Sequence, residues 1–223
     1  GEVRHLGGRA VAIAADLSLQ DERLAAFAQA RQALGPIDLL VNNAGELAGG
    51  TLGRLDDAEI ARSVALNLAA PMHLTQLALP DLTARRGAVV LVASMAGIVP
   101  LPYASVYSGS KAGLVGFGRA LRYELEPLGV RLLIANPPAT DTAMTDGMIA
   151  AAGLPVELAR LQSPEQIGED IVAALVRGRH ELIWPGADHL LALAWRLAPW
   201  LVAAGLRSQR GRFARAMGRG GRS

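Results

Sequence analysis

The sequence of 223 residues contains no cysteine, which excludes disulfide bonds and thiolate metal sites. We expect no metal centre. Charged residues make up only 19% of the chain and hydrophobic residues 51%, a composition typical of a globular protein rather than a disordered one. A chain of this length can bury a substantial core within one domain.

Negative charge is missing from the C-terminal end. No Asp or Glu follows Asp188. The same stretch contains seven arginines, namely Arg196, Arg207, Arg210, Arg212, Arg215, Arg219 and Arg222. Because the net charge of the whole chain is only +2 although this stretch adds seven positive charges, the body is near neutral or slightly acidic, and we expect no nucleic-acid partner.

Lysine and asparagine are scarce. Lys111 is the only lysine among 22 Lys and Arg residues. Asn occurs at four positions, Asn42, Asn43, Asn67 and Asn136. A chain so strongly biased toward Arg still uses Lys at one position, which indicates that a compact ammonium with a tunable pKa is needed there.

Short apolar runs alternate with helical patterns along the chain. The predicted strands cover residues 10–15, 38–41, 87–94, 130–135 and 181–184. The predicted helices cover 18–34 with Ser18 as its cap, 56–84, 105–126, and a segment that opens at Ser163 with Gln166 in a capping box. This alternation predicts an α/β, Rossmann-like, doubly wound parallel sheet. We assign the α/β domain to residues 1–186, followed by an apolar helix and an Arg-rich tail at 187–223.

Polar residues follow the predicted strands where each one ends. They are Asp16, the pair Asn42 and Asn43, Ser94, and Asn136. Each alone is an ordinary turn former. Four such positions at the carboxyl edge of one parallel sheet indicate a ligand site, because these sheets bind ligands at that edge.

Tyr107 and Lys111 are the sharpest local signal. Residues four apart lie on one face of a helix, so the ammonium can act on the phenol. A phenol has a pKa near 10, and a neighbouring cation lowers it toward the working range of a general acid or base.

These motifs together resemble the short-chain dehydrogenase/reductase family from about residue 1 to 185. Asn42-Asn43-Ala44-Gly45 matches the family's Asn-Asn-Ala-Gly, and Asn67 falls at the position of its catalytic Asn. Ser94 precedes Tyr107 by 13 residues, and Lys111 completes the tetrad. The resemblance implies an NAD(P)-dependent oxidoreductase that interconverts an alcohol and its aldehyde or ketone.

The resemblance also assigns roles to the four tetrad residues. Tyr107 is implied to be the general acid or base, and Ser94 to orient the substrate oxygen. Lys111 is implied to bind the nicotinamide ribose and to lower the pKa of Tyr107. Asn67 is implied to hold a water that links Lys111 to solvent.

Further positions are implied to contact NAD or NADP. Asp16 and Leu17 would meet the adenine, and Asn43, Ala44 and Gly45 the adenosine side. Thr140 and Thr142 would meet the nicotinamide end. We further expect a small, apolar alcohol or carbonyl substrate, a homo-oligomer and a cytoplasmic location.

Two departures from the family pattern stand out. In the family, the strand that corresponds to residues 130–135 usually continues into Pro-Gly, where this chain has Pro137-Pro138. Proline removes a backbone N–H and fixes φ, which predicts a displaced loop over the nicotinamide. The family's Thr-Gly-x-x-x-Gly-x-Gly turn, which places pyrophosphate on a helix N-terminus, has no counterpart. We therefore interpret the chain as a truncated member that lacks its first strand-helix-strand unit. The alternative is a degenerate, non-catalytic binding or scaffold protein that cannot hold cofactor.

The segment 190–206 is mostly apolar but interrupted by Arg196 and Pro199. We favour a helix pair that packs on the body as a lid or subunit contact. Two alternatives stay open: peripheral membrane contact through 190–215, and a true membrane span.

Overall fold

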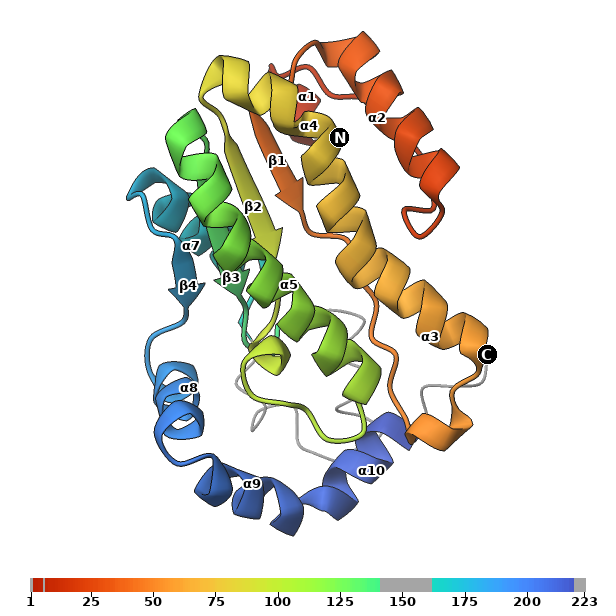
Figure 1. The fold of residues 1–223 in the computed structure, drawn as a ribbon, viewed down its shortest axis with the longest axis vertical. Helices are drawn as coiled ribbons and strands as arrows, with labels where there is room; N and C mark the ends of the chain where they lie inside the picture. Colours follow the sequence, from red (N-terminus) through yellow and green to blue (C-terminus); the bar gives the residue numbers. More distant parts are fainter. Residues whose placement is uncertain (1, 6, 141–161, 219–223) are drawn as a thin grey trace.

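A computed structural model describes residues 2–5, 7–140 and 162–218 (Figure 1). Its strands are β1 (Leu39–Asn42), β2 (Ala88–Val92), β3 (Arg131–Asn136) and β4 (Glu181–Ile183). Its first α-helices are α1 (Glu2–His5), α2 (Gln20–Leu34), α3 (Asp57–Val64), α4 (Ala70–Arg85) and α5 (Ser105–Leu125). The later ones are α7 (Pro164–Val176), α8 (Ala187–Leu197), α9 (Pro199–Ser208) and α10 (Arg210–Gly218). Short 3-10 helices cover Leu52–Arg54, Met95–Gly97 and Glu126–Leu128.

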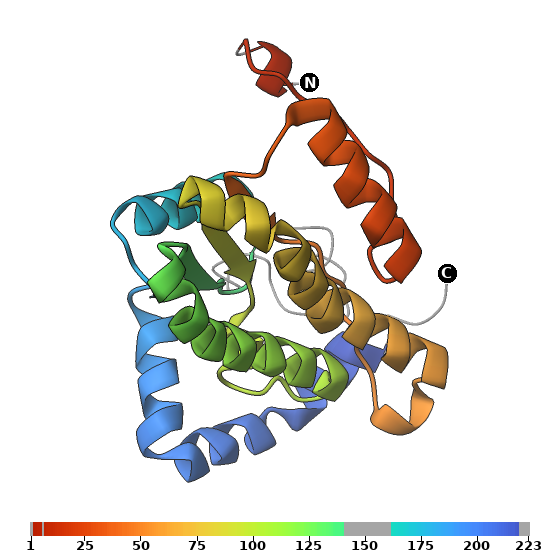
Figure 2. The same cartoon turned by 45° about the horizontal axis from the view of Figure 1, so that its top comes forward.

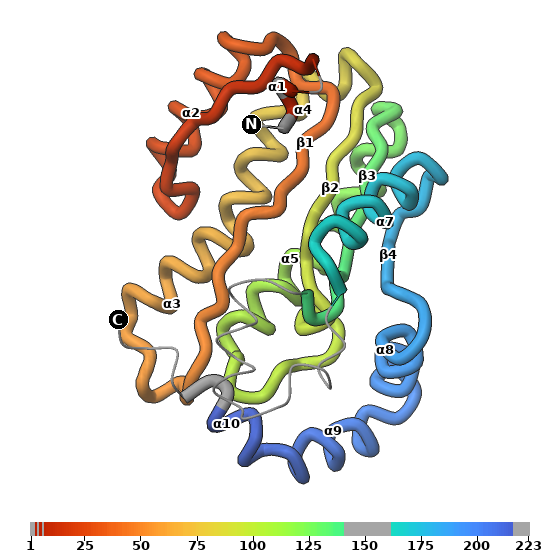
Figure 3. The backbone as a smooth tube through the Cα atoms, turned by 180° about the vertical axis from the view of Figure 1, so that it is seen from behind, coloured from red at the N-terminus to blue at the C-terminus, as the bar shows by residue number. Residues whose placement is uncertain are grey.

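The four strands form one parallel sheet in the order β1-β2-β3-β4. Leu39 pairs with Ala88, and Val89 with Leu132. Parallel neighbours need crossover connections, which put helices on the faces of the sheet. Helices α4 and α5 cover one face and α7 covers the other (Figures 1 and 3). The predicted Rossmann-like α/β fold is therefore confirmed.

The core has one hydrophobic cluster on each face of the sheet. The α4 and α5 side includes Leu82, Val89, Leu91, Leu114, Leu125 and Ile134. The α7 side includes Val90, Leu133, Ile167, Leu182 and Trp184. Successive residues of a strand point to opposite faces, so Val89 and Val90 enter different clusters. This two-sided burial explains why the β2 and β3 sequences are continuously apolar.

The predicted helix 56–84 is a continuous helical path with an irregular centre. Asp56 caps α3 in a capping box, because its side chain accepts from the Glu59 N–H and the Glu59 side chain accepts from the Asp56 N–H. Between α3 and α4, the five residues Ala65–Ala69 form a π-helix. Such turns are rare and often mark functional sites, and this one carries Asn67.

The predicted strand at 10–15 is wrong. These residues lie outside any helix or strand, and Val11 is 47% exposed. A strand needs a hydrogen-bonded neighbour, and β1, at the edge of the described sheet, does not pair with this segment. The apolar run satisfies the sequence pattern of a strand, but no strand of the described sheet pairs with it.

The two predicted helix caps have different outcomes. Ser18 does not cap α2, because the N-cap position is Leu19 and the Ser18 hydroxyl donates to the Asp16 carboxylate at 2.7 Å. Ser163 does cap α7 by accepting from the Gln166 N–H at 3.1 Å. The expected capping box is incomplete, since the Gln166 side chain donates to Asp170.

Helix α2 stands apart from the sheet, beside α4 (Figure 2). Polar contacts join the two helices: Arg31 pairs with Asp81 at 2.7 Å, and Arg23 donates to the His73 ring at 3.4 Å. On the opposite side, α8, α9 and α10 form an arc that leaves the sheet after β4 and runs around its carboxyl edge (Figures 1 and 3).

No single helix in the described parts of the chain is long and apolar enough to cross a membrane. Helices α8 and α9 meet that length and composition only when taken together, and they are bent by 117° relative to each other.

Candidate active site

Tyr107 and Lys111 lie on consecutive turns near the N-terminal end of α5. The Lys111 ammonium is 5.9 Å from the centre of the Tyr107 ring. Lys111 is 4% exposed, and its Nζ donates to the Val92 carbonyl at the end of β2 at 2.9 Å. This bond ties the lysine to the carboxyl edge of the sheet.

Burial governs the titration of both side chains. It lowers the pKa of Lys111 to about 8 and raises the pKa of Tyr107, while a hydrogen bond from the Ser94 side chain acts in the lowering direction on Tyr107. The lowering of the Tyr107 pKa by Lys111, expected from the sequence, is therefore not the dominant effect. The physical reason is that removal of water from the phenolate is the largest cause of the shift, and Lys111 is not among its causes.

Ser94 lies two residues beyond β2 and opens the 3-10 turn Met95–Gly97. Its hydroxyl accepts from the Ala96 N–H at 3.1 Å. The turn packs directly on α5, because a side-chain carbon at Gly97 would lie 2.8 Å from the Lys111 carbonyl. Because Gly97 has no side chain, the turn that follows Ser94 can pack against the α5 backbone at Lys111.

Asn67 is fully buried, and both the oxygen and the nitrogen of its amide are hydrogen-bonded. Its Oδ1 accepts from the Glu46 N–H at 2.9 Å, and its Nδ2 donates to the Glu46 carbonyl at 2.8 Å. The same Nδ2 reaches the hydroxyls of Ser63 and Ser110, both at 3.2 Å. Asn67 therefore holds the loop after β1 against α5.

Gly45 brings these groups to one point. A Cβ at this position would lie 3.0 Å from Asn67 Oδ1 and 3.3 Å from Lys111 Nζ. Three residues singled out in the sequence thus converge beside α5. Asn43 and Ala44 precede Gly45 in the same loop, and both are exposed.

Asp16 and Leu17 lie in the loop that precedes α2. Asp16 accepts from the Ser18 N–H and hydroxyl and pairs with Arg62 at 2.6 Å. The Ser18 hydrogen bond, followed by that of Arg62, lowers the pKa of Asp16 to about 2. The Leu17 carbonyl accepts from Arg23 at 2.7 Å, so its backbone is fixed as well.

Of the two predicted threonines, only Thr140 lies within the described residues. Its hydroxyl donates to the Pro138 carbonyl at 3.1 Å, and its backbone bridges to Gln162. The Pro137 carbonyl accepts from the Met95 N–H at 3.0 Å, which joins the end of β3 to the Ser94 loop. Thr142 lies outside the described residues.

Two residues of this region, Arg62 and Ser110, were missed in the sequence. Arg62 pairs with Glu46 at 3.1 Å as well as with Asp16, so it joins the loop after β1 to the loop before α2. Ser110 donates to the Tyr107 carbonyl at 2.8 Å and accepts from Asn67. The position of Ser110 next to the only lysine was a usable signal, whereas the pairing of Arg62 depends on the fold alone.

Comparison with known proteins gives relatives of one family. Residues 1–152 match the family described as short chain dehydrogenase. The chain is 37% identical over 184 residues to the ketoacyl reductase HetN of Nostoc sp., a match covering 81% of this chain and 63% of that protein. It is 30% identical over 200 residues to rat estradiol 17-beta-dehydrogenase 11, covering 88% of this chain and 65% of that protein. The chain thus spans less than two thirds of these relatives.

Solved structures show the same fold. A short chain dehydrogenase from Burkholderia cenocepacia in complex with NADP superposes with a TM-score of 0.76 at 24% identity, over 90% of this chain and 80% of that one. An alcohol dehydrogenase from Thermococcus sibiricus in complex with 5-hydroxy-NADP gives 0.71 at 20% identity, over 82% of this chain and 77% of that one. On the family match and the sequence relatives together, the chain belongs to the short-chain dehydrogenase family of oxidoreductases.

Proposed function

We propose that the protein is an NAD(P)-dependent oxidoreductase that interconverts an alcohol and its aldehyde or ketone, with Tyr107 as general acid or base. The observation that carries this proposal is the pairing of two desolvated groups at the carboxyl edge of the sheet. Tyr107 interacts with Ser94, and the ammonium of Lys111 lies 5.9 Å from the Tyr107 ring. A phenol beside a hydroxyl and a cation is suited to exchange a proton with a carbonyl oxygen.

The protonation states of these groups at neutral pH suit the reduction of a carbonyl compound. Because burial raises the pKa of Tyr107, the phenol holds its proton at neutral pH and can donate it to a carbonyl oxygen. Ser94 would orient that oxygen. Lys111, whose pKa is about 8, is mostly protonated at neutral pH and can stabilise the phenolate that remains. The site is thus prepared for carbonyl reduction.

The residues of this chain would hold the nicotinamide and adenine ends of a nicotinamide cofactor, and the cofactor would supply the hydride. Gly45 leaves open the space beside Asn67 and Lys111 that a side chain would fill. Lys111 and Tyr107 would hold the ribose, Asn43 and Ala44 would line the adenosine side with Gly45, and Thr140 and Thr142 would lie at the nicotinamide. Asp16 and Leu17 would meet the adenine. The pyrophosphate would need a Gly-rich turn that these 223 residues do not contain.

An apolar, lipid-like carbonyl compound is the substrate class that the relatives favour. Besides the ketoacyl reductase, they include a bovine protein named 3-ketodihydrosphingosine reductase, 33% identical over 155 residues. We extend this class to the present protein, together with a homo-oligomeric state and a cytoplasmic location. A non-catalytic scaffold is the second candidate, favoured by the missing Gly-rich turn.

The decisive variant is Tyr107→Phe, which removes one hydroxyl. The assay follows NADPH and NADH consumption with a panel of long-chain ketones and aldehydes. It uses this chain together with any residues that precede Gly1 in the full-length protein. We expect Tyr107→Phe to lower kcat by about 10² to 10⁴-fold, the usual contribution of general acid-base catalysis, with little change in cofactor affinity.

The matched control is Tyr123→Phe, in the same helix α5, where the side chain is 68% exposed. It should keep the kcat of the unmodified protein. If Tyr107→Phe keeps more than a tenth of kcat, Tyr107 is not the acid or base. If no substrate is turned over and neither cofactor binds, the scaffold candidate replaces this proposal.

A further inference from the structure

The C-terminal helices α8 and α9 present a row of large apolar side chains to solvent. Leu190, Leu197, Trp200 and Leu201 are each 65% exposed or more. On α8, the positions 190, 194 and 197 follow the spacing of a single helix face. A closely packed lid would bury these side chains, so this row contradicts the expected lid, whereas the subunit contact expected as its alternative would leave them exposed in a single chain.

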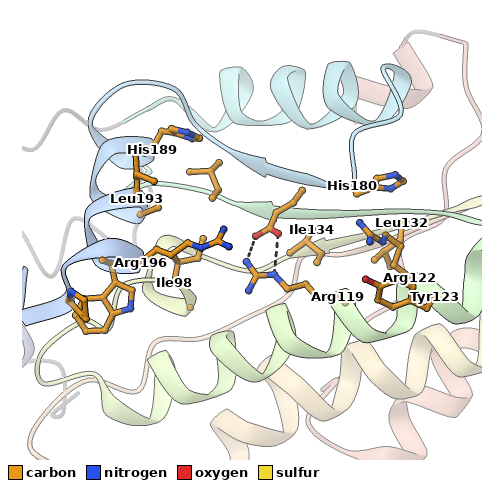
Figure 4. A pocket seen from close by; sticks show the side chains of 17 residues that line it. Ile98, Arg119, Arg122, Tyr123, Leu132, Ile134, His180, His189, Leu193 and Arg196 are labelled. Atoms are coloured by element: carbon orange, nitrogen blue, oxygen red, sulfur yellow. Dashed lines mark hydrogen bonds and ion pairs between the residues drawn. The ribbon is translucent and has the colours of Figure 1, made fainter.

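The inner face of α8 is not closely packed either. A cavity of about 1180 Å³ separates α8 from α5 and the sheet. His189, Leu193 and Arg196 border it from α8, opposite Ile134 and the ion pair between Arg119 and Glu181 (Figure 4). Of α8, only Ala192 is buried, and the helix belongs to neither of the two hydrophobic clusters of the core.

Positive charge follows the apolar row without any negative charge. Arg207, Arg210, Arg212 and Arg215 are exposed. Within residues 187–218, no ion pair of these arginines is found. Since no Asp or Glu follows Asp188, neutralising groups must come from outside this segment.

We propose that α8, α9 and α10 form a peripheral docking surface for an anionic lipid bilayer. The 117° bend between α8 and α9 excludes a straight span by this pair and allows both helices to lie in the plane of the interface. The leucines would enter the boundary between headgroups and acyl chains, and Trp200 would sit at headgroup depth. The arginines of α9 and α10 would bind lipid phosphates, whose negative charge would neutralise these side chains.

A second copy of the chain fits this surface less well than a bilayer. A symmetric dimer places the same patch on both partners, so it would bring two sets of unneutralised arginines together. A bilayer containing anionic lipid offers apolar depth and negative charge to the same segment at once. The surface also runs around the carboxyl edge of the sheet, where Tyr107 lies (Figure 1).

The test is flotation of the full chain with vesicles. Vesicles of pure phosphatidylcholine are compared with vesicles that also contain phosphatidylglycerol, at low and high salt. We expect binding to the anionic vesicles that weakens as salt is added. The double variant Trp200→Ser/Leu201→Ser should weaken it by about tenfold or more. Its control is Val172→Ser/Val176→Ser on α7, where both valines are over 60% exposed, and this variant should bind normally.

A second variant tests the role of charge in the same flotation assay: it replaces Arg207, Arg210, Arg212 and Arg215 by Gln. Each arginine near an anionic surface contributes about fivefold in affinity, so the loss of all four should reach several hundredfold, on the order of 600-fold. The control Arg177→Gln/Arg179→Gln changes two exposed arginines that follow α7 and should have no effect. Circular dichroism checks that every variant is folded.

Three results would overturn the proposal. The first is flotation no better than without vesicles, and the second is equal binding to neutral and anionic vesicles. The third is a stable dimer, seen by analytical ultracentrifugation without lipid, that Trp200→Ser/Leu201→Ser dissociates. That last result would make a second copy of the chain the partner of this surface.

Discussion

The buried amide of Asn67 gives the site its most specific stability prediction. Asn67→Ala removes both hydrogen bonds to the Glu46 backbone and those to Ser63 and Ser110. A buried polar group left without its partner costs about 1–3 kcal/mol. Each serine oxygen loses one donor, but a hydroxyl can still donate, as Ser110 does to the Tyr107 carbonyl, so the cost comes mainly from the two Glu46 groups.

Because Glu46 is only half-buried, each of its groups takes a value near the low end, and the free energy of unfolding should fall by about 2–4 kcal/mol. In a chain of this size, 1 kcal/mol shifts Tm by about 2–4 °C, which gives a fall of roughly 5–15 °C. Thermal unfolding followed by circular dichroism measures it. The matched control is Asn43→Ala in the same loop, where the side chain is exposed and Tm should stay close to that of the unmodified protein.

A Tm of Asn67→Ala equal to that of Asn43→Ala would refute this reasoning. Asn67 would then not hold the loop that contains Glu46, and any role of Asn67 in the site would be in the reaction rather than in stability.

Three further predictions concern charge and cofactor. The pKa of Lys111 is about 8 when folded and 10.5 ordinarily, so the unfolded chain binds more protons between these values, and stability should rise by about 2 kcal/mol from pH 8 to pH 10. Urea unfolding should show this rise and lose it in Lys111→Met, whereas Lys111→Arg should fold but lose at least about tenfold in kcat, since a guanidinium cannot replace a compact ammonium. Arg62→Gln should raise the pKa of Asp16 from about 2 while leaving it below 3.8, because the Ser18 hydrogen bond remains. An NMR titration of the Asp16 carboxyl group measures this change, and an unchanged pKa would mean that Arg62 does not pair with Asp16 in solution. The 223-residue chain alone should show no NADPH binding at micromolar concentration by fluorescence, because it lacks a Gly-rich turn for the pyrophosphate, and a low-micromolar Kd would contradict this.

Most of the sheet could be predicted from the sequence. The continuous apolar runs of β2 and β3 reflect burial on both faces, which leaves a strong local signal. The segment 10–15 has the same signal, yet it has no strand beside it in the described chain. Pairing is a property of two segments, so composition within one of them cannot reveal it.

The candidate site shows the same division. Tyr107 and Lys111 could be singled out because they share a helix face and Lys111 is the only lysine. Asn67 could be singled out because asparagine is scarce and this one falls at the position of the family's catalytic Asn. Arg62 pairs with Asp16 across 46 positions of the chain, and no local pattern marks such a pair. The direction of the Tyr107 pKa was also beyond sequence reasoning, since it depends on how much water the fold removes from the phenol.

Transfer of deuterium from cofactor to product tests the central claim most directly. The full-length protein is supplied with NADPH, or NADH, deuterated at the transferring position of the nicotinamide and with a ketone that it consumes, and the alcohol product is examined by mass spectrometry and NMR. The account predicts one deuterium at the carbinol carbon, formed at a rate that Tyr107→Phe lowers by about a hundredfold or more and Tyr123→Phe leaves unchanged. An alcohol without deuterium, or equal rates in the two tyrosine variants, would contradict it.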